Sequence, residues 1–503
     1  MALKAGLAAA AILGLAACSS APGASSSGPT ATLDTGAVQG ASEGNLSVFR
    51  GIPYAAAPVG NLRWRAPQPL AKWTGVRPAT EVGAACPQAT TSTEPWARVG
   101  AQSEDCLFLN IWTPSQASSA KLPVMFFIHG GSFRAGAGGV PLYDGTALAK
   151  RGAVIVTINY RLGRLGFFAH PALTKENTDG YLGNYGIMDQ VEALRWVKRN
   201  ITQFGGDPAN VTIFGESAGA VSVQALVASP EAKGLVAKAS SQSGGGFTLA
   251  PTLKASEAQG ESWAAKQGLA NATAEQLRAI PTDKIPSLDA GGPMVDGKTV
   301  KDSPTKTFIL KEQAAIPMIL GGNSWEASLP GLDMAARPIL GTAYSGLLEE
   351  YKAKPTRAGA EADLSIQAVA IQPSRYLAER QAALGQPAFT YYFTQQPESE
   401  RTTKPGAEHG GELSYLFGTR LNAEKWDAAD EKTSKLMGDY WFNFAKTGNP
   451  NTPGAPAWEP VTSTSSRYMH LNADASTTDF TALENKTKDA GVASARRIWG
   501  QEK

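Results

Sequence analysis

One serine of this chain lies in a pattern that turns a serine hydroxyl into a nucleophile. Residues 215–219 read G-x-S-x-G, with Ser217 at the centre. The pattern follows the apolar run 211–214 and precedes the apolar stretch 220–228, so it joins a predicted strand to a predicted helix. Such a turn is tight enough to need small flanking residues, and it exposes the hydroxyl beside the positive end of the helix dipole. The sequence therefore predicts Ser217 as a nucleophile that needs a base and a group that orients the base.

The rest of the chain predicts an α/β fold that could position such a turn. Short apolar runs bounded by turn residues are typical of strands buried on both faces, and they occur at 122–128, 153–159, 211–214, 316–320 and 389–393. Between them, residues 186–204 carry an apolar stripe at helical spacing. This alternation indicates a large, mostly parallel central sheet with helices on both faces. The more polar stretches 250–315 and 327–380 are expected to be irregular insertions over one end of the sheet, above the active site.

Composition excludes several classes of protein. The chain has 503 residues, of which 43% are hydrophobic and 18% charged, with a formal net charge of +2. Disordered chains need low hydrophobicity and high net charge, and nucleic-acid binders need surplus cations, so neither class fits and no nucleic-acid partner is expected. The only long apolar run is N-terminal, which excludes several membrane spans.

The N-terminus has the pattern of an export signal. Lys4 precedes an apolar run at residues 5–17 that is too short to span a bilayer. The run ends in Leu-Ala-Ala-Cys at 15–18, which resembles a bacterial lipobox and implies that Cys18 is lipidated. We therefore expect a signal peptide at 1–17, a flexible Ser/Gly/Ala/Pro tether at 18–32 and one domain at 33–503. The protein would be exported and anchored by lipid, at the outer membrane or in the periplasm, or at the cell surface if the source is Gram-positive. The alternative is an ordinary cleaved signal with an incidental cysteine.

The cysteine count agrees with export. If Cys18 is lipidated, Cys86 and Cys106 are the only two left, and one disulfide is expected between them in an oxidising compartment. The alternative is two separate buried thiols.

Four sequence blocks resemble one enzyme family. Residues 204–219, which include G-E-S-A-G, are similar to the serine active-site signature of the type-B carboxylesterase/cholinesterase family, and E-D-C-L-F-L-N-I-W-T-P at 104–114 is similar to its second signature. The blocks F-R-G-I-P-Y-A at 49–55 and N-F-A-K-T-G-N-P at 443–450 resemble its N- and C-terminal motifs. The resemblance runs from about Leu33 to about Trp499. It implies the α/β-hydrolase fold and the hydrolysis of carboxylic esters.

The resemblance also implies the other two members of a catalytic triad, in the order Ser, Glu, His. G-G-N-S-W-E at 321–326 resembles the acid block and indicates Glu326, although Ala327 follows where the family usually has Gly. G-A-E-H-G-G-E-L at 406–413 resembles the histidine block and indicates His409 as the base. The other three histidines fit less well. His129 opens the oxyanion motif, and neither His170 nor His470 lies in a loop that is flanked by Gly and follows one of the last predicted strands.

H-G-G-S-F at 129–133 resembles the family's oxyanion loop. By this match Gly131 and Ser132 donate backbone N–H groups to the oxyanion, with Ala218 as a third donor. Ser132 stands where many relatives have Gly, so donation by its backbone depends on a φ angle there that suits a residue with a Cβ, and which two of the N–H groups point inward stays open.

Further residues have predicted supporting roles. Glu216, beside the nucleophile, either tunes the charge of the pocket or makes structural hydrogen bonds, and Ser243 resembles a serine of the family that lies behind the triad. Arg63 and Glu104 resemble an ion pair that fixes the disulfide loop. Trp96, ten residues before Cys106, matches a tryptophan that faces the cationic alcohol group in cholinesterase-like relatives, although simple packing is the alternative.

Together these features predict a serine carboxylesterase that acts on a small-molecule ester. No metal cluster and no dinucleotide-binding motif is apparent, so no cofactor is expected. The alternatives are a non-catalytic binding protein on the same fold, as in the neuroligin-like branch, and an enzyme for carbamates, amides or polymer esters. Because Ser217 is retained, catalysis is favoured. The acyl preference and the oligomeric state are open at this point.

Overall fold

The computed structural model describes residues 28–89, 92, 94–247, 250–286, 291–354, 356–420, 425–462 and 467–499. The predicted signal peptide 1–17 and Cys18 lie outside these residues, as does most of the predicted tether 18–32. The last residues of that tether, however, form strand β1, Thr30–Thr32, which pairs with β2, Ala37–Gln39. Ala31 is buried between two exposed threonines, a strand pattern too short to stand out in the sequence. The fold therefore begins before the predicted boundary at Leu33.

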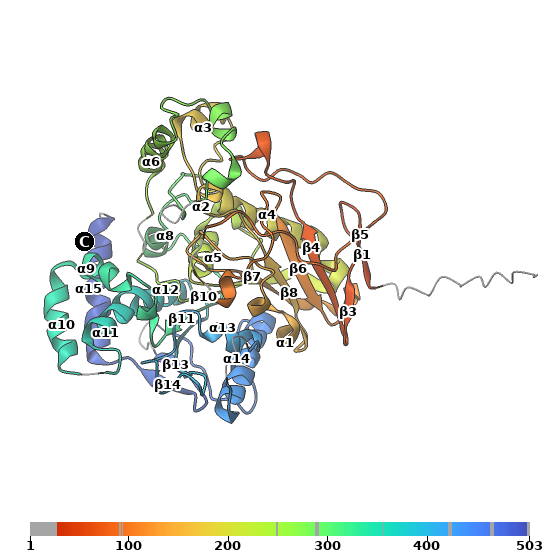
Figure 1. Ribbon diagram of the computed structural model, residues 1–503. Helices are drawn as coiled ribbons and strands as arrows, with labels where there is room; N and C mark the ends of the chain where they lie inside the picture. Colours follow the sequence, from red (N-terminus) through yellow and green to blue (C-terminus); the bar gives the residue numbers. More distant parts are fainter. Residues whose placement is uncertain are drawn as a thin grey trace, which may run out of the picture.

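A mixed sheet of eleven strands forms the centre of the molecule (Figure 1). Its strand order is β14-β13-β12-β11-β10-β9-β7-β8-β6-β4-β3. The run from β13 to β8 is parallel, and the pairs towards both edges are antiparallel. Its strands are β3 (Ala41–Glu43), β4 (Leu46–Pro53), β6 (Phe108–Thr113), β7 (Leu122–Ile128), β8 (Val154–Ile158), β9 (Gly206–Glu216), β10 (Lys238–Gln242), β11 (Met318–Asn323), β12 (Ala388–Phe393), β13 (Arg467–Leu471) and β14 (Ser476–Asp479). Strand β5, Val76–Pro78, pairs with β2 in a separate small sheet with β1.

The α-helices pack around this sheet. In chain order they are α1 (Thr146–Ala149), α2 (Gly163–Gly166), α3 (Pro171–Glu176), α4 (Tyr185–Asn200), α5 (Ala218–Ala228), α6 (Leu253–Lys266), α7 (Ala274–Arg278), α8 (Pro304–Leu310), α9 (Leu332–Leu340), α10 (Tyr344–Lys352), α11 (Ala360–Ile366), α12 (Gln372–Ala382), α13 (Glu412–Phe417), α14 (Ala428–Thr447) and α15 (Ala482–Ile498). No helix in the described ranges has both the length and the apolar character of a membrane span.

Two hydrophobic cores, one on each face, hold the helices to the sheet. In β7, Val124, Phe126 and Ile128 face the first core, which α4, α5 and α12 cover. Met125 and Phe127 face the second core, which α1, α13 and α14 cover. Because both faces are buried, the strand reads as a continuous apolar run, which is why its bounds could be predicted from the sequence.

The two predicted insertions differ from expectation in one respect. We expected 250–315 and 327–380 to be irregular, but they contain α6 to α8 and α9 to α12. Helices α9, α10, α11 and α15 share a core of their own, with Leu340, Leu347, Leu364 and Leu483 among its members. They lie beside the β11–β14 end of the sheet in Figure 1. Because these helices bury their apolar residues against one another, their sequences lack the long apolar runs of the central elements.

Candidate active site

Ser217 lies at a sharp turn between strand β9 and helix α5. Its φ and ψ angles are +55° and −122°, a backbone conformation that a residue with a side chain rarely adopts. Its N–H donates to the Gln242 carbonyl at 2.9 Å, and its carbonyl accepts from the Val221 N–H at 3.0 Å. A Cβ on Gly219 would lie 2.0 Å from the Ile128 carbonyl oxygen, so this position requires glycine. The turn therefore has the geometry that the G-x-S-x-G pattern predicts.

Glu326 and His409 meet in loops that follow the neighbouring strands β11 and β12. The Nδ1 atom of His409 is hydrogen-bonded to Glu326 Oε2. The other carboxylate oxygen, Oε1, accepts from Ser243 Oγ at 2.5 Å and from the Asn323 N–H at 2.7 Å. Glu326 is buried, so these contacts replace its hydration. The structure thus brings together Glu326, His409 and Ser243 as predicted.

The backbones of these two loops are bonded to each other. Trp325 and Glu408 form an isolated parallel bridge, and the Trp325 N–H donates to the Ala407 carbonyl at 2.8 Å. The His409 N–H donates to Ser328 Oγ at 2.9 Å. These bonds fix the imidazole relative to the carboxylate independently of the side-chain contact.

The Glu216 carboxylate approaches the other side of the imidazole. Its Oε1 atom lies 3.1 Å from His409 Nε2, which is an ion-pair distance. Burial alone would lower the pKa of His409, but the carboxylates of Glu216 and Glu326 outweigh burial and raise it. Burial raises the pKa of Glu216, whereas for Glu326 the charge and hydrogen bond of His409 outweigh burial and lower the pKa. The site therefore stabilises an imidazolium between two acidic groups.

Ser217 is adjacent to this cluster without being bonded to it. It directly follows Glu216 in the chain, but His409 Nε2 has no hydrogen-bond partner among the described residues. Hydrogen bonds between a nucleophile and its base are often long in the absence of substrate. Nε2 is thus held by no hydrogen bond among the described residues, and its near neighbour Glu216 directly precedes Ser217.

The predicted oxyanion loop packs against the same turn. A Cβ on Gly130 would lie 2.5 Å from Glu216 Oε2, so the loop approaches the turn closely. Ser132 has a φ of +56°, in the left-handed region, which costs a residue with a Cβ about 1–3 kcal/mol. Within the described ranges, the N–H groups of Gly131, Ser132 and Ala218 donate no hydrogen bond. All three groups are therefore free to receive an oxyanion, and their role stays a prediction.

Cys86 and Cys106 form the predicted disulfide. The predicted ion pair is present beside it: Arg63 Nε donates to Glu104 Oε2 at 2.8 Å, and both side chains are nearly buried. Arg63 also donates through Nη1 to the Arg278 carbonyl at 2.8 Å, which ties this segment to helix α7. These contacts confirm the structural role that we predicted for the pair.

Trp96, within the disulfide loop, lies beside the oxyanion loop. A Cβ on Gly131 would lie 3.4 Å from Trp96 Cζ3. The tryptophan is therefore close to the site, while its contact with a cationic alcohol group stays a prediction.

Three buried polar residues at the site, Asn323, Gln242 and Glu412, were not singled out from the sequence. Asn323 donates through Nδ2 to Glu412 Oε2 at 2.5 Å, and Gln242 donates to Glu412 Oε1 at 3.2 Å. Burial raises the pKa of Glu412 to about 7. The sequence signal that could have found Glu412 is its position: a carboxylate three residues after His409, at the start of a mainly apolar helix. In the described ranges, no group of three His, Cys, Asp or Glu side chains is arranged as metal ligands would be.

Comparison with known proteins identifies the family. The chain matches the model of the carboxylesterase family over residues 27–353 and 345–490. It is 36% identical over 456 residues to the fumonisin B1 esterase of Sphingopyxis macrogoltabida, a match that covers 84% of this chain and 83% of that protein. It is also 36% identical over 462 residues to the para-nitrobenzyl esterase of Bacillus subtilis, covering 86% and 93% of the two chains.

Solved structures agree with the sequence matches. A PNB esterase structure superposes with a TM-score of 0.81 at 30% identity, covering 91% of this chain and 99% of that one. A carboxylesterase of Geobacillus stearothermophilus superposes with a TM-score of 0.79 at 33% identity, covering 92% and 99%. Sequence and fold lead to the same assignment: the chain belongs to the carboxylesterase family and is a carboxylic ester hydrolase with the α/β-hydrolase fold.

Proposed function

We propose that this chain is a serine carboxylesterase that forms an acyl-enzyme on Ser217, with His409 as the base and Glu326 as the group that orients it. The observation that carries the proposal is the hydrogen bond between His409 and the buried Glu326 carboxylate, beside the strained turn of Ser217. A small-molecule ester is the substrate, and no cofactor takes part.

In the first half-reaction, Ser217 Oγ attacks the ester carbonyl while His409 Nε2 takes the hydroxyl proton. Glu326 stabilises the imidazolium that forms. The imidazolium then gives its proton to the leaving alcohol, and the C–O bond of the ester breaks. In the second half-reaction, His409 takes a proton from water, the hydroxide attacks the acyl-enzyme, and the proton returns to Ser217 as the acid leaves.

The tetrahedral intermediates of both half-reactions carry a negative oxygen. The free N–H groups of Gly131, Ser132 and Ala218 would receive it, and each such donor typically contributes about 3 kcal/mol in the transition state. Because donation comes from the backbone, the Ser132 side chain is not required for it.

The direct test is hydrolysis of p-nitrophenyl butyrate by the wild type and by Ser217→Ala. We expect kcat/KM to fall by at least about 10⁴-fold in the variant, because the remaining groups have no nucleophile to activate. The matched control is Ser222→Ala on the same helix, whose hydroxyl accepts from Gln190 Nε2 at 3.0 Å and has no role in the reaction. A folded Ser217→Ala protein that retained wild-type turnover would contradict the proposal.

We also propose that the protein is exported and lipid-anchored at Cys18. The disulfide between Cys86 and Cys106 supports export, because structural disulfides persist in oxidising compartments. In a bacterium that processes lipoproteins, Cys18→Ser is expected to move the protein from the membrane fraction to the soluble fraction. An unchanged distribution would show that Cys18 is not the anchor.

A further inference from the structure

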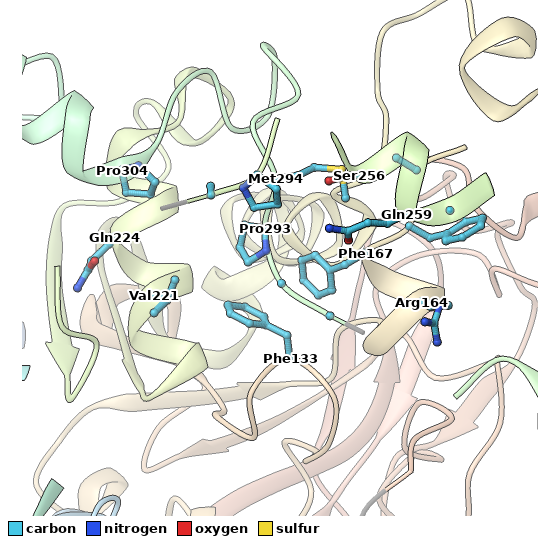
Figure 2. A pocket seen from close by; sticks show the side chains of 17 residues that line it. Phe133, Arg164, Phe167, Val221, Gln224, Ser256, Gln259, Pro293, Met294 and Pro304 are labelled. Atoms are coloured by element: carbon cyan, nitrogen blue, oxygen red, sulfur yellow. The ribbon is translucent and has the colours of Figure 1, made fainter. Parts of the chain in front are cut away.

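A cavity of about 390 Å³ lies beside helix α5 and beside Phe133, at the end of the predicted oxyanion loop (Figure 2). Val221, one turn of α5 beyond Ser217, lines it, and so does Phe133, which directly follows the oxyanion residues. Phe167 and Met294 add further apolar walls. This volume is within the range of small-molecule sites, and the walls are mainly apolar, as in most of them.

The position of the cavity indicates which half of an ester it takes. His409 delivers the proton to the leaving alcohol, so the alcohol departs on the His409 side of the carbonyl carbon. Neither His409 nor Glu216 lines the cavity; its lining comes from α5, from Phe133 at the end of the oxyanion loop, from residues 164–169 and from the insertion at 250–304. The acyl group of the ester is therefore the part that enters.

One buried polar side chain lies along the path that this acyl group would follow. Ser217, Val221 and Gln224 are spaced so that they share one face of α5, and Gln224 is about 10 Å from Ser217 along the helix axis. Gln224 is 2% exposed and lines the cavity. In Figure 2 it lies beyond Val221, at one end of the apolar walls.

The hydrogen bonds of Gln224 determine what it offers to a ligand. Its Nε2 donates to Ser241 Oγ at 3.0 Å and to the Gly245 carbonyl at 3.0 Å. Both amide hydrogens are thereby used, and because a carbonyl can only accept, the amide cannot be flipped. The Oε1 atom accepts no hydrogen bond from any described residue. Unlike the fully enclosed polar atoms that lack a partner, this oxygen stays accessible, so a donor inside the cavity that Gln224 lines could bond to it.

We propose that the cavity binds the acyl chain of the substrate and that Gln224 Oε1 accepts a hydrogen bond from a hydroxyl group about 10 Å from the ester carbonyl. The favoured substrates are then esters of ω-hydroxy fatty acids, apolar next to the carbonyl and hydroxylated at the far end. No carboxylate belongs to the described lining, so a neutral hydroxyl is the matching donor rather than an ammonium group. This inference rests on the proposed function and adds the acyl class to it.

The test compares two p-nitrophenyl esters of equal length, ω-hydroxyoctanoate and ω-methoxyheptanoate. The methoxy group fills the same space but cannot donate. We expect wild-type kcat/KM to be about threefold to tenfold higher for the hydroxy ester, the worth of one neutral hydrogen bond. In Gln224→Leu the ratio of kcat/KM for the hydroxy ester to that for the methoxy ester is expected to fall to about one, mainly because kcat/KM for the hydroxy ester decreases. The wild-type comparison stands by itself if that variant fails to fold.

Two further variants separate the acceptor from general effects. Gln267→Leu makes the same change at an exposed position outside the cavity and is expected to leave the hydroxy-to-methoxy ratio unchanged. Ser256→Ala removes the hydroxyl of another buried residue that lines the cavity, and its ratio is also expected to persist. A ratio lost in Ser256→Ala but kept in Gln224→Leu would overturn the assignment of Gln224.

The remaining outcomes distinguish this inference from the proposed function. Equal wild-type rates on both esters, with turnover lost in Ser217→Ala, would overturn the hydroxyacyl preference and leave the serine esterase intact. A second substrate pair places the same groups in the alcohol half: acetates of an ω-hydroxy and of an ω-methoxy alcohol. If the enzyme preferred the hydroxyl only in this pair, the assignment of the cavity to the acyl chain would be overturned. No turnover of any ester by folded protein would overturn both proposals.

Discussion

Three buried carboxyl groups surround the single imidazole of the site. Glu326 bonds to Nδ1, Glu216 lies 3.1 Å from Nε2, and Glu412 acts from further away through its charge. The balance between burial and these charges sets how readily His409 holds a proton. The motifs located Ser217, Glu216, Glu326 and His409 because each stands in a distinctive short block. They gave no role to Glu412, because its bonding partners lie on strands far away in the sequence.

Glu216→Gln tests this balance through the pH dependence of kcat/KM. The imidazole must be neutral to accept the serine proton, so activity falls as the pH drops through the pKa of His409. Glu216 raises that pKa, so its removal is expected to lower the pKa and move the acid limb to lower pH by about one unit. The exposed Glu361→Gln is the control and is expected to leave the limb in place. An acid limb that did not move in Glu216→Gln would show that the carboxylate does not act on His409.

At the scale of elements, a strand could be predicted from the sequence where its buried residues are also apolar. Strand β7 has the predicted bounds, whereas β10, with the sequence Lys-Ala-Ser-Ser-Gln, went unpredicted although it is fully buried. Its two serines have distant partners: Trp441 Nε1 donates to Ser240 Oγ at 3.1 Å, and Gln224 donates to Ser241 Oγ. Contacts between segments that lie far apart in the sequence cannot be predicted from local composition. The helices of the two insertions were missed for the same reason, because they bury their apolar residues against one another.

The disulfide loop is an element whose contribution to stability can be measured. The double variant Cys86→Ala/Cys106→Ala is expected to lower the free energy of unfolding by about 3 kcal/mol, because the open loop gains freedom in the unfolded chain. Urea denaturation measures the change. Reduced wild type is the matched control and is expected to unfold at nearly the same urea concentration as the variant. Equal stability of the oxidised wild type and the variant would contradict this account.

At the scale of the whole molecule, the sheet places the three predicted triad residues after three strands that run in the same direction. Ser217 follows β9, Glu326 follows β11, and the loop of His409 follows β12. Because these strands are parallel, their carboxyl ends meet at one edge, where ligands of open α/β sheets bind. The alternation of elements and the family blocks predicted this organisation. They could not predict the cavity, because its walls come from α5, the oxyanion loop and an insertion that meet only in the folded chain.

The central claim is that Ser217 carries the acyl group, and covalent labelling tests it most directly. A fluorophosphonate reacts with an activated serine, so the wild-type protein is expected to gain one adduct per chain, with ester hydrolysis lost in proportion. Peptide mapping by mass spectrometry should place the adduct on the peptide that contains Ser217, and neither Ser217→Ala nor His409→Ala should be labelled at an appreciable rate. An adduct on another residue that abolishes hydrolysis, or full hydrolysis by protein labelled at Ser217, would contradict the account.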